Sequence, residues 1–87
     1  MKVQNMLSPN GNKVANQFII SDKNGETFQS YETIVAKVQK GKLILDTNAL
    51  NYSRTTSKYL YEFARMDRKE IEKGIKAGDV LVKNLNK

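Results

Sequence analysis

The sequence predicts an α+β fold: a three- to four-stranded antiparallel β-meander followed by two helices and a C-terminal strand. Apolar and polar residues alternate between turn-forming pairs up to position 46, whereas helix-forming residues dominate from Thr47 onward. A run of strands before a run of helices is typical of one sheet with helices on one face. The 87 residues are expected to form a single small domain, residues 1–87.

The first predicted elements are strands joined by turns. Residues 1–12 form either a short strand or a loosely held arm, and they end in a turn rich in Pro, Asn and Gly. A strand is predicted over residues 14–21. Asn24-Gly25 then favours a type I′ hairpin turn, because both central residues of that turn take positive φ. Residues 26–31 are expected to return as the next strand.

Residues 33–38 have two interpretations. Their β-branched side chains favour a strand, and a short helical turn starting near Ser30 is the alternative. Because Lys40-Gly41 precedes the apolar run 43–46, a second hairpin is the favoured interpretation. The meander is therefore expected to contain three or four strands.

A first helix is predicted to begin after Ser53 or Thr55, either of which can cap it, and to run to about Met66. Leu60 and Phe63 are spaced to lie on its buried side.

A second helix is predicted from residue 67 onward. The segment 67–70 matches a capping box, with Asp67 in place of Ser or Thr, and Ile71 and Ile75 form the apolar stripe. Gly78 fits the left-handed position that ends a helix. Residues 80–85 are expected to form a last strand that pairs with a sheet edge.

The sequence contains no histidine and no cysteine. The usual general base, the thiol nucleophile and the soft metal ligands are therefore all missing. The acidic residues form no catalytic cluster, so the sequence predicts a protein that is not an enzyme and holds no metal or cofactor. No apolar run reaches signal-peptide length or the roughly 20 residues that span a bilayer, so a cytoplasmic location is expected.

The chain is basic, with 15 Lys and Arg against nine Asp and Glu and a net charge of +6. Such a balance favours a polyanionic partner, because Lys and Arg near phosphates release counterions. The alternative is that the charge only keeps a small domain soluble, since it lies within the range of about 2–8 that suits such domains.

Candidate binding residues gather at the expected helices. Hydroxyls and cations lie together at the first helix start, where backbone N–H groups and the helix dipole favour an anion. The alternative is plain capping. The second helix is basic, although Glu70 and Glu72 interleave and a solvated face explains it as well. The candidate nucleic-acid-binding residues are Ser53, Arg54, Thr55, Ser57, Lys58, Arg65, Arg68, Lys69 and Lys73.

Four tyrosines add a further candidate feature. Aromatic rings beside Arg54 and Lys58 can stack on unpaired bases, although a domain of this size needs most of its rings to cover the sheet. The four are Tyr31, Tyr52, Tyr59 and Tyr61.

Three stretches carry a resemblance that spans most of the chain. Residues 8–18 (SPNGNKVANQF), 28–31 (FQSY) and 52–60 (YSRTTSKYL) resemble small uncharacterised proteins of bacteriophages and mobile elements. The resemblance implies no activity and assigns no residue a role. It raises the expectation of two functions common among short phage proteins, binding nucleic acid and binding a host protein.

Two hypotheses follow. The first is a non-enzymatic phage or mobile-element accessory protein that binds DNA or RNA through its basic helical half. The second is a protein–protein interaction module, such as an inhibitor of a host or defence protein or a small homo-oligomer, because an apolar edge strand invites pairing with another chain. The residues that would carry this second function are Val80, Leu81 and Val82.

Overall fold

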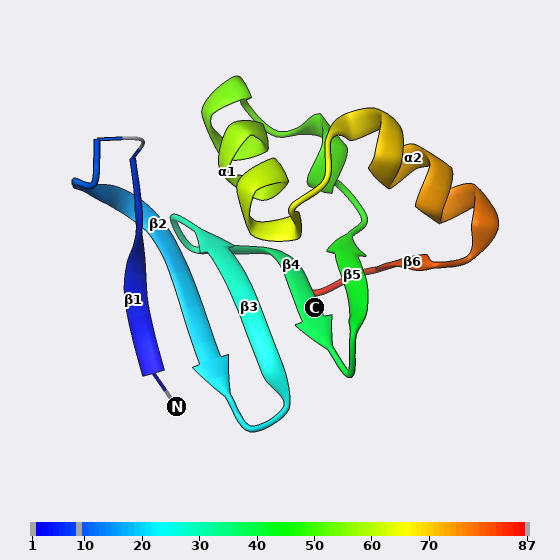
Figure 1. Cartoon of the computed structure of the whole chain (residues 1–87), viewed down its shortest axis with the longest axis horizontal. Helices are drawn as coiled ribbons and strands as arrows, with labels where there is room; N and C mark the ends of the chain where they lie inside the picture. The colour runs from blue at the N-terminus through cyan, green and yellow to red at the C-terminus, as the bar shows by residue number, and fades with distance from the viewer. Residues whose placement is uncertain (1, 9, 87) are drawn as a thin grey trace.

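The computed structural model describes residues 2–8 and 10–86 and shows an α+β arrangement with one mixed sheet (Figure 1). In the described chain the sheet has six strands in sequence order, and only β6 runs parallel to its neighbour, β5. The strands are β1 (Lys2–Leu7), β2 (Lys13–Asp22), β3 (Gly25–Ser30), β4 (Thr33–Gln39), β5 (Lys42–Asp46) and β6 (Val80–Lys83). Between β5 and β6 come the short 3-10 helix η1 (Ala49–Asn51) and the helices α1 (Arg54–Ala64) and α2 (Arg68–Ala77).

This architecture confirms the α+β class, the antiparallel meander, the two helices and the C-terminal strand. The strand count was wrong, because the meander has five strands rather than three or four. Of the two alternatives for the N-terminal segment, a strand or a loosely held arm, residues 2–7 form the strand. They pair with β2, from Lys2 opposite Ser21 to Asn5 opposite Phe18. Residues 33–39 also form a strand, hydrogen-bonded to β3 on one side and to β5 on the other.

The two expected hairpins form, but the type I′ geometry expected at Asn24-Gly25 is found at Lys40-Gly41 instead. Lys40 and Gly41 both have positive φ (53° and 76°), as a type I′ turn requires. In the other hairpin the loop is Lys23-Asn24, since Asp22 pairs with Gly25, so a type I′ turn centred on Asn24-Gly25 was wrong. The Asp22 carboxylate explains the shift: its Oδ1 accepts a hydrogen bond from the Asn24 N–H at 2.8 Å.

Gly25 is needed as a strand residue rather than a turn residue. Its φ is 141°, and a Cβ at this position would collide with the carbonyl oxygen of Val38 on β4. The glycine therefore permits a close approach of two strands, which the Asn-Gly pattern alone does not indicate.

The helices pack on the sheet around one apolar cluster. α1 contacts β3 and β4, and α2 contacts β6. Leu60 and Ile71 are fully buried, as expected, and the Phe63 ring lies 5.7 Å from that of Phe28 on β3. The buried apolar residues of this cluster are Met6, Phe28, Val35, Ala36, Leu43, Leu45, Ala49, Tyr59, Leu60, Ile71 and Val80.

The predicted helix caps are confirmed. The Ser53 hydroxyl accepts a hydrogen bond from the Thr56 N–H, and Asp67 forms a complete capping box with Glu70. Gly78 ends α2 in the left-handed conformation, with φ 85°. Arg65 adopts the same conformation at the end of α1, which turns the chain sharply toward α2.

Candidate nucleic-acid interface

A cavity of about 560 Å³ lies where η1, α1 and the start of α2 meet. Its size is within the range of roughly 300–1,000 Å³ that is usual for ligand sites. We call this cavity the helical groove, and the residues that line it are Leu50, Tyr52, Arg54, Ser57, Lys58, Tyr61 and Arg68.

One face of α1 supplies most of the helical groove. Arg54, Ser57, Lys58 and Tyr61 follow the spacing i, i+3, i+4, i+7, which places them along a single stripe of the helix. The opposite stripe of α1 contains its buried residues Thr56, Tyr59 and Leu60. The pattern that packs α1 on the sheet thus also directs its cations and Tyr61 away from the core.

Arg68 reaches the helical groove from the other helix. The left-handed Arg65 ends α1, and the Asp67 cap starts α2 only three residues later, so Arg68 occupies the first position of α2 beside α1. Its Nε lies 3.9 Å from Oε1 of Glu72, and both side chains are about half exposed. An exposed pair at that separation leaves most of the positive charge available.

The helical groove is electropositive. Three of the described residues that line it are cations and none is acidic. The Lys58 ammonium lies 5.6 Å from the centre of the Tyr59 ring, within the range of a cation–π contact. The arrangement can bind an anion with several negatively charged oxygens.

Tyr52 forms a fixed wall of the helical groove. Its hydroxyl donates a 2.9 Å hydrogen bond to Oδ2 of the buried Asp46. Burial, this hydrogen bond and the charge of Asp46 together raise the pKa of Tyr52 to about 12. Burial alone would raise the pKa of Asp46, but hydrogen bonds from the backbone of Leu85 and Asn48, and from the Tyr52 side chain, lower it below the ordinary value.

The amino-acid sequence also assigns the chain to a protein family. A model described as a family of unknown function (DUF8033) matches residues 1–78. The chain belongs to the DUF8033 family. No curated protein and no solved structure matches it. The match covers every residue of the helical groove and ends before β6, so the groove is part of the DUF8033 region and β6 is not.

Four of the nine predicted binding residues meet in the helical groove of this DUF8033 protein: Arg54, Ser57, Lys58 and Arg68. Ser53 instead lines a smaller neighbouring cavity of about 220 Å³ with Thr56 and Ser30. Its hydroxyl donates to Thr56 Oγ1, which is 3.0 Å from Ser30 Oγ, so the cap of α1 is tied to β3.

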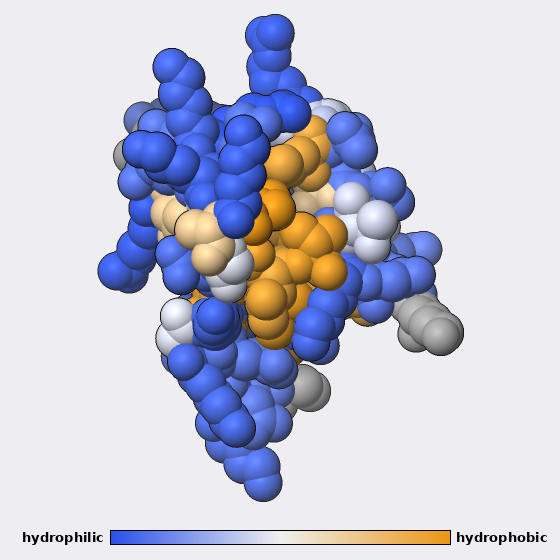
Figure 2. All heavy atoms as spheres, turned by 90° about the vertical axis from the view of Figure 1, so that its right-hand side faces the viewer, coloured by the Kyte–Doolittle hydropathy of each residue, from blue (hydrophilic) through white to orange (hydrophobic). Residues whose placement is uncertain are grey.

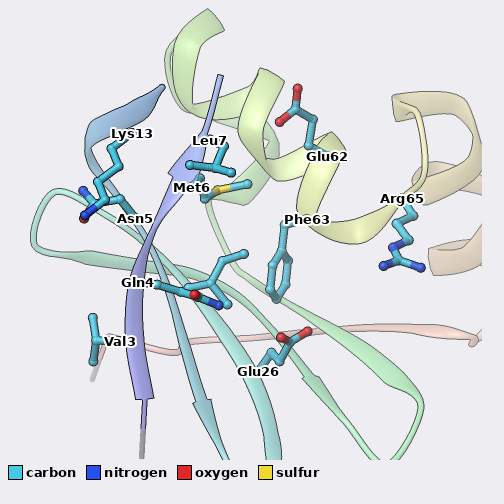
Figure 3. A pocket seen from close by; sticks show the side chains of 11 residues that line it. Val3, Gln4, Asn5, Met6, Leu7, Lys13, Glu26, Glu62, Phe63 and Arg65 are labelled. Carbon is cyan, nitrogen blue, oxygen red and sulfur yellow. The ribbon is translucent and has the colours of Figure 1, made fainter. Parts of the chain in front are cut away.

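The remaining predicted residues lie elsewhere. Thr55 is exposed in the first turn of α1, and Lys69 and Lys73 are exposed on the side of α2 opposite the buried Ile71. Arg65 lines a third cavity, of about 630 Å³, between β1 and the end of α1. Figure 3 shows Phe63 pointing from α1 into this cavity, with Glu62 and Glu26 on either side of it.

The protein-interaction residues of β6 also differ in exposure. Val80 is buried against α2, Leu81 is half-buried, and Val82 is 45% exposed. Among the described residues no group of three or more acidic, histidine or cysteine side chains is placed to hold a metal ion. None of the helices described is long and apolar enough to cross a membrane.

Sequence reasoning missed two contributors to the site. Leu50 and Asp46 precede the predicted helix and have no motif of their own. Tyr61 was named only as one of four tyrosines. Its spacing, three residues after Lys58 and seven after Arg54, is the signal that could have placed its ring on the cationic stripe of α1.

Proposed function

We propose that this protein binds nucleic acid through the helical groove, as a non-enzymatic accessory protein of a phage or mobile element. The main support is one observation: three cations and two tyrosine rings line one cavity that has no acidic residue among the described residues of its wall. Phosphates bind Lys and Arg, and aromatic rings bind bases, so the two classes of side chain suit the two parts of a nucleotide. The resemblance in sequence to phage and mobile-element proteins supports the accessory role.

The charge of the whole chain supports the same proposal. A net charge of +6 attracts a polyanion over a long range and raises the rate of encounter. The first turn of α1 adds the positive end of its helix dipole beside Arg54. Arg54, Lys58 and Arg68 then contact phosphates, each with release of counterions.

Salt dependence of binding tests this proposal. We expect a fluorescein-labelled oligonucleotide to bind with an affinity that falls steeply between about 50 and 200 mM salt. The double variant Arg54→Ala/Lys58→Ala should lower the slope of log K against log salt by about 0.7–0.9 per lost phosphate contact.

The matched control removes the same charge at a distance. Lys2 and Lys23 are exposed at the start of β1 and in the β2–β3 turn, so Lys2→Ala/Lys23→Ala should leave the slope nearly unchanged. Equal loss in both double variants would show that net charge rather than the helical groove carries the binding. Absence of binding at the lowest salt would reject a nucleic-acid function.

A second candidate function rests on the β6 edge. β6 is the last strand of the described sheet, so one of its sides lacks a strand partner. Leu81 and Ile44 are the apolar residues of a cavity of about 450 Å³ beside it, which is otherwise lined by Asn24, Gln39, Lys40 and Lys42. Figure 2 shows apolar side chains gathered on the side of the molecule where α2 and β6 lie. An open apolar edge suits pairing with a strand of another chain, including a second copy.

Mass measurement by light scattering over a range of protein concentrations tests this candidate. We expect a dimer that Val82→Lys converts to a monomer, because a lysine on an edge strand opposes pairing. A strict monomer that co-purifies with no other protein would contradict the β6 interface.

A further inference from the structure

We infer that the helical groove accepts an unpaired base, so that the ligand is single-stranded nucleic acid. This inference rests on the proposed function and names the class of ligand. It comes from the side chains that the groove brings together: its three cations line the same open groove as Leu50, Tyr52 and Tyr61.

An aromatic wall is useful only for a base whose ring face is free. In a duplex the bases are stacked on one another, and only phosphates, sugars and base edges reach a protein surface. A duplex could therefore contact Arg54, Lys58 and Arg68 but could not place a base against Tyr61. A single strand can turn one base inward while its phosphates stay at the cations.

The two tyrosines have different roles in this arrangement. Asp46 fixes the Tyr52 hydroxyl, which limits the motion of that ring before any ligand arrives. A wall that is already ordered loses less conformational entropy on binding. Tyr61 lies on the cationic stripe of α1, three residues after Lys58. Because its side chain is only half-buried, its ring is available for stacking beside the phosphate that Lys58 contacts.

The spacing of the stripe suits one nucleotide unit. Lys58 and Tyr61 are three residues apart on α1, which places them about one helical turn, or roughly 5 Å, apart along the axis. Ser57 lies between Arg54 and Tyr61 on the same stripe, and among the described residues its hydroxyl donates a long, 3.5 Å hydrogen bond to the Tyr52 carbonyl. That hydroxyl can exchange this weak contact for one to a sugar or base.

The test compares labelled oligo-dT of about 16 nucleotides with a duplex of the same length. We expect the single strand to bind more tightly, and Tyr61→Leu to weaken its binding by roughly 5- to 150-fold, the loss of one stacked base. Tyr61→Phe keeps the ring and should bind nearly as well as the unchanged protein. Leucine preserves the apolar contact of position 61 with the core, and circular dichroism verifies the fold.

A spectroscopic signal separates stacking from a structural role. The chain has no tryptophan, so its fluorescence comes from four tyrosines, and a stacked base quenches the tyrosine beneath it. Oligo-dT should quench part of this emission in the unchanged protein. In Tyr61→Phe that quenching should disappear while affinity remains.

If Tyr61→Leu does not fold, Ser57→Glu provides the second variant. It places a carboxylate in the helical groove within the first turns of α1, where the helix dipole tolerates a negative charge. We expect it to abolish binding of oligo-dT without loss of helix content.

The outcomes are distinguishable. Equal affinity for duplex and single strand would overturn the single-strand inference if Tyr61→Leu also had no effect on affinity or oligo-dT did not quench the tyrosine emission. In that case, loss of binding in Arg54→Ala/Lys58→Ala would still support the proposed function. No binding to either oligonucleotide, or binding that neither the cation variants nor Ser57→Glu changes, would overturn both.

Discussion

Asp46 is the residue on which the surroundings of the helical groove depend most directly. Its carboxylate is 4% exposed, yet it accepts hydrogen bonds from the Leu85 N–H at 3.0 Å, the Asn48 N–H at 3.2 Å and the Tyr52 hydroxyl at 2.9 Å. A buried carboxylate is tolerated only when its oxygens are paired in this way. One side chain thus joins the C-terminal segment, the loop before η1 and a wall of the groove.

We expect Asp46→Asn to lower the free energy of unfolding at neutral pH by about 1–3 kcal/mol, because an amide cannot accept all three hydrogen bonds. The pKa of Asp46 is lower in the folded protein than the unfolded value of about 3.9. Its contribution is therefore complete above about pH 4 and is lost as pH falls through the folded pKa. Urea unfolding at neutral and acidic pH measures both effects.

The comparison between the two proteins is the control. The gap in stability between the unchanged protein and Asp46→Asn should narrow as the pH falls below about 4, because the unfolded chain then binds a proton at Asp46 before the folded protein does. The narrowing is complete only below the lowered folded pKa, where Asp46 is neutral in both states. Parallel loss of stability in the two proteins over this range would mean that the Asp46 charge contributes nothing. At neutral pH, Asp46→Asn should also weaken oligonucleotide binding, because Tyr52 loses its anchor.

At the scale of elements, side-chain chemistry predicted the helices better than the strands. The caps at Ser53 and Asp67 and the stop at Gly78 each follow from one local interaction, and each could be predicted from the sequence. The strands depend on partners far along the chain. The β-branched residues of 33–38 favoured a strand but left a helical turn open, and the pairing with β3 and β5 that decides for the strand is not contained in any local pattern.

The backbone irregularities in the sheet could not be predicted from the sequence either. Asn16 and Tyr31 have positive φ (64° and 55°), and the Tyr31 N–H donates to the Asn16 carbonyl at 2.6 Å. Between Asn5, opposite Phe18, and Leu7, opposite Lys13, the register with β2 shifts, so the extra residues of this irregularity lie on β2 and include Asn16. Asparagine tolerates the left-handed region, but its presence alone does not tell where a bulge will form.

At the scale of the whole molecule, the helical groove is built from three consecutive elements, η1, α1 and the start of α2. Arg54, Lys58 and Tyr61 could be grouped by helical spacing, whereas Arg68 joins them only because α1 ends at Arg65. The same turn directs Arg65 away from the helical groove, and Arg65 instead lines the cavity near β1 with Glu26 and Glu62. Which cations converge was thus set by the path between the helices and not by their density in the sequence.

The C-terminal segment is hydrogen-bonded to β4 through a side chain rather than through a strand backbone. β5 pairs with β4 only as far as Ala36, opposite Leu45, so the backbone of Ile34 lies beyond the end of that ladder. Asn86 occupies this position. Its Oδ1 accepts from the Ile34 N–H at 2.7 Å, and its Nδ2 donates to the Ile34 carbonyl at 2.9 Å. One amide side chain therefore makes both hydrogen bonds that a neighbouring strand would make.

Substitution of Asn86 tests this long-range closure. We expect Asn86→Ala to lower the free energy of unfolding by about 1–2 kcal/mol, since each of two exposed hydrogen bonds contributes about 0.5–1.5 kcal/mol. Asn86→Asp should cost more, because a carboxylate cannot donate to the Ile34 carbonyl and adds a charge near Asp46. Asn84→Ala is the matched control, because within the described residues the hydrogen bond of the Asn84 side chain is local, accepted from the Asn86 N–H two residues later. Faster hydrogen exchange at the Ile34 amide should accompany both Asn86 variants. Unchanged protection of that amide would show that the side-chain pairing does not persist in solution.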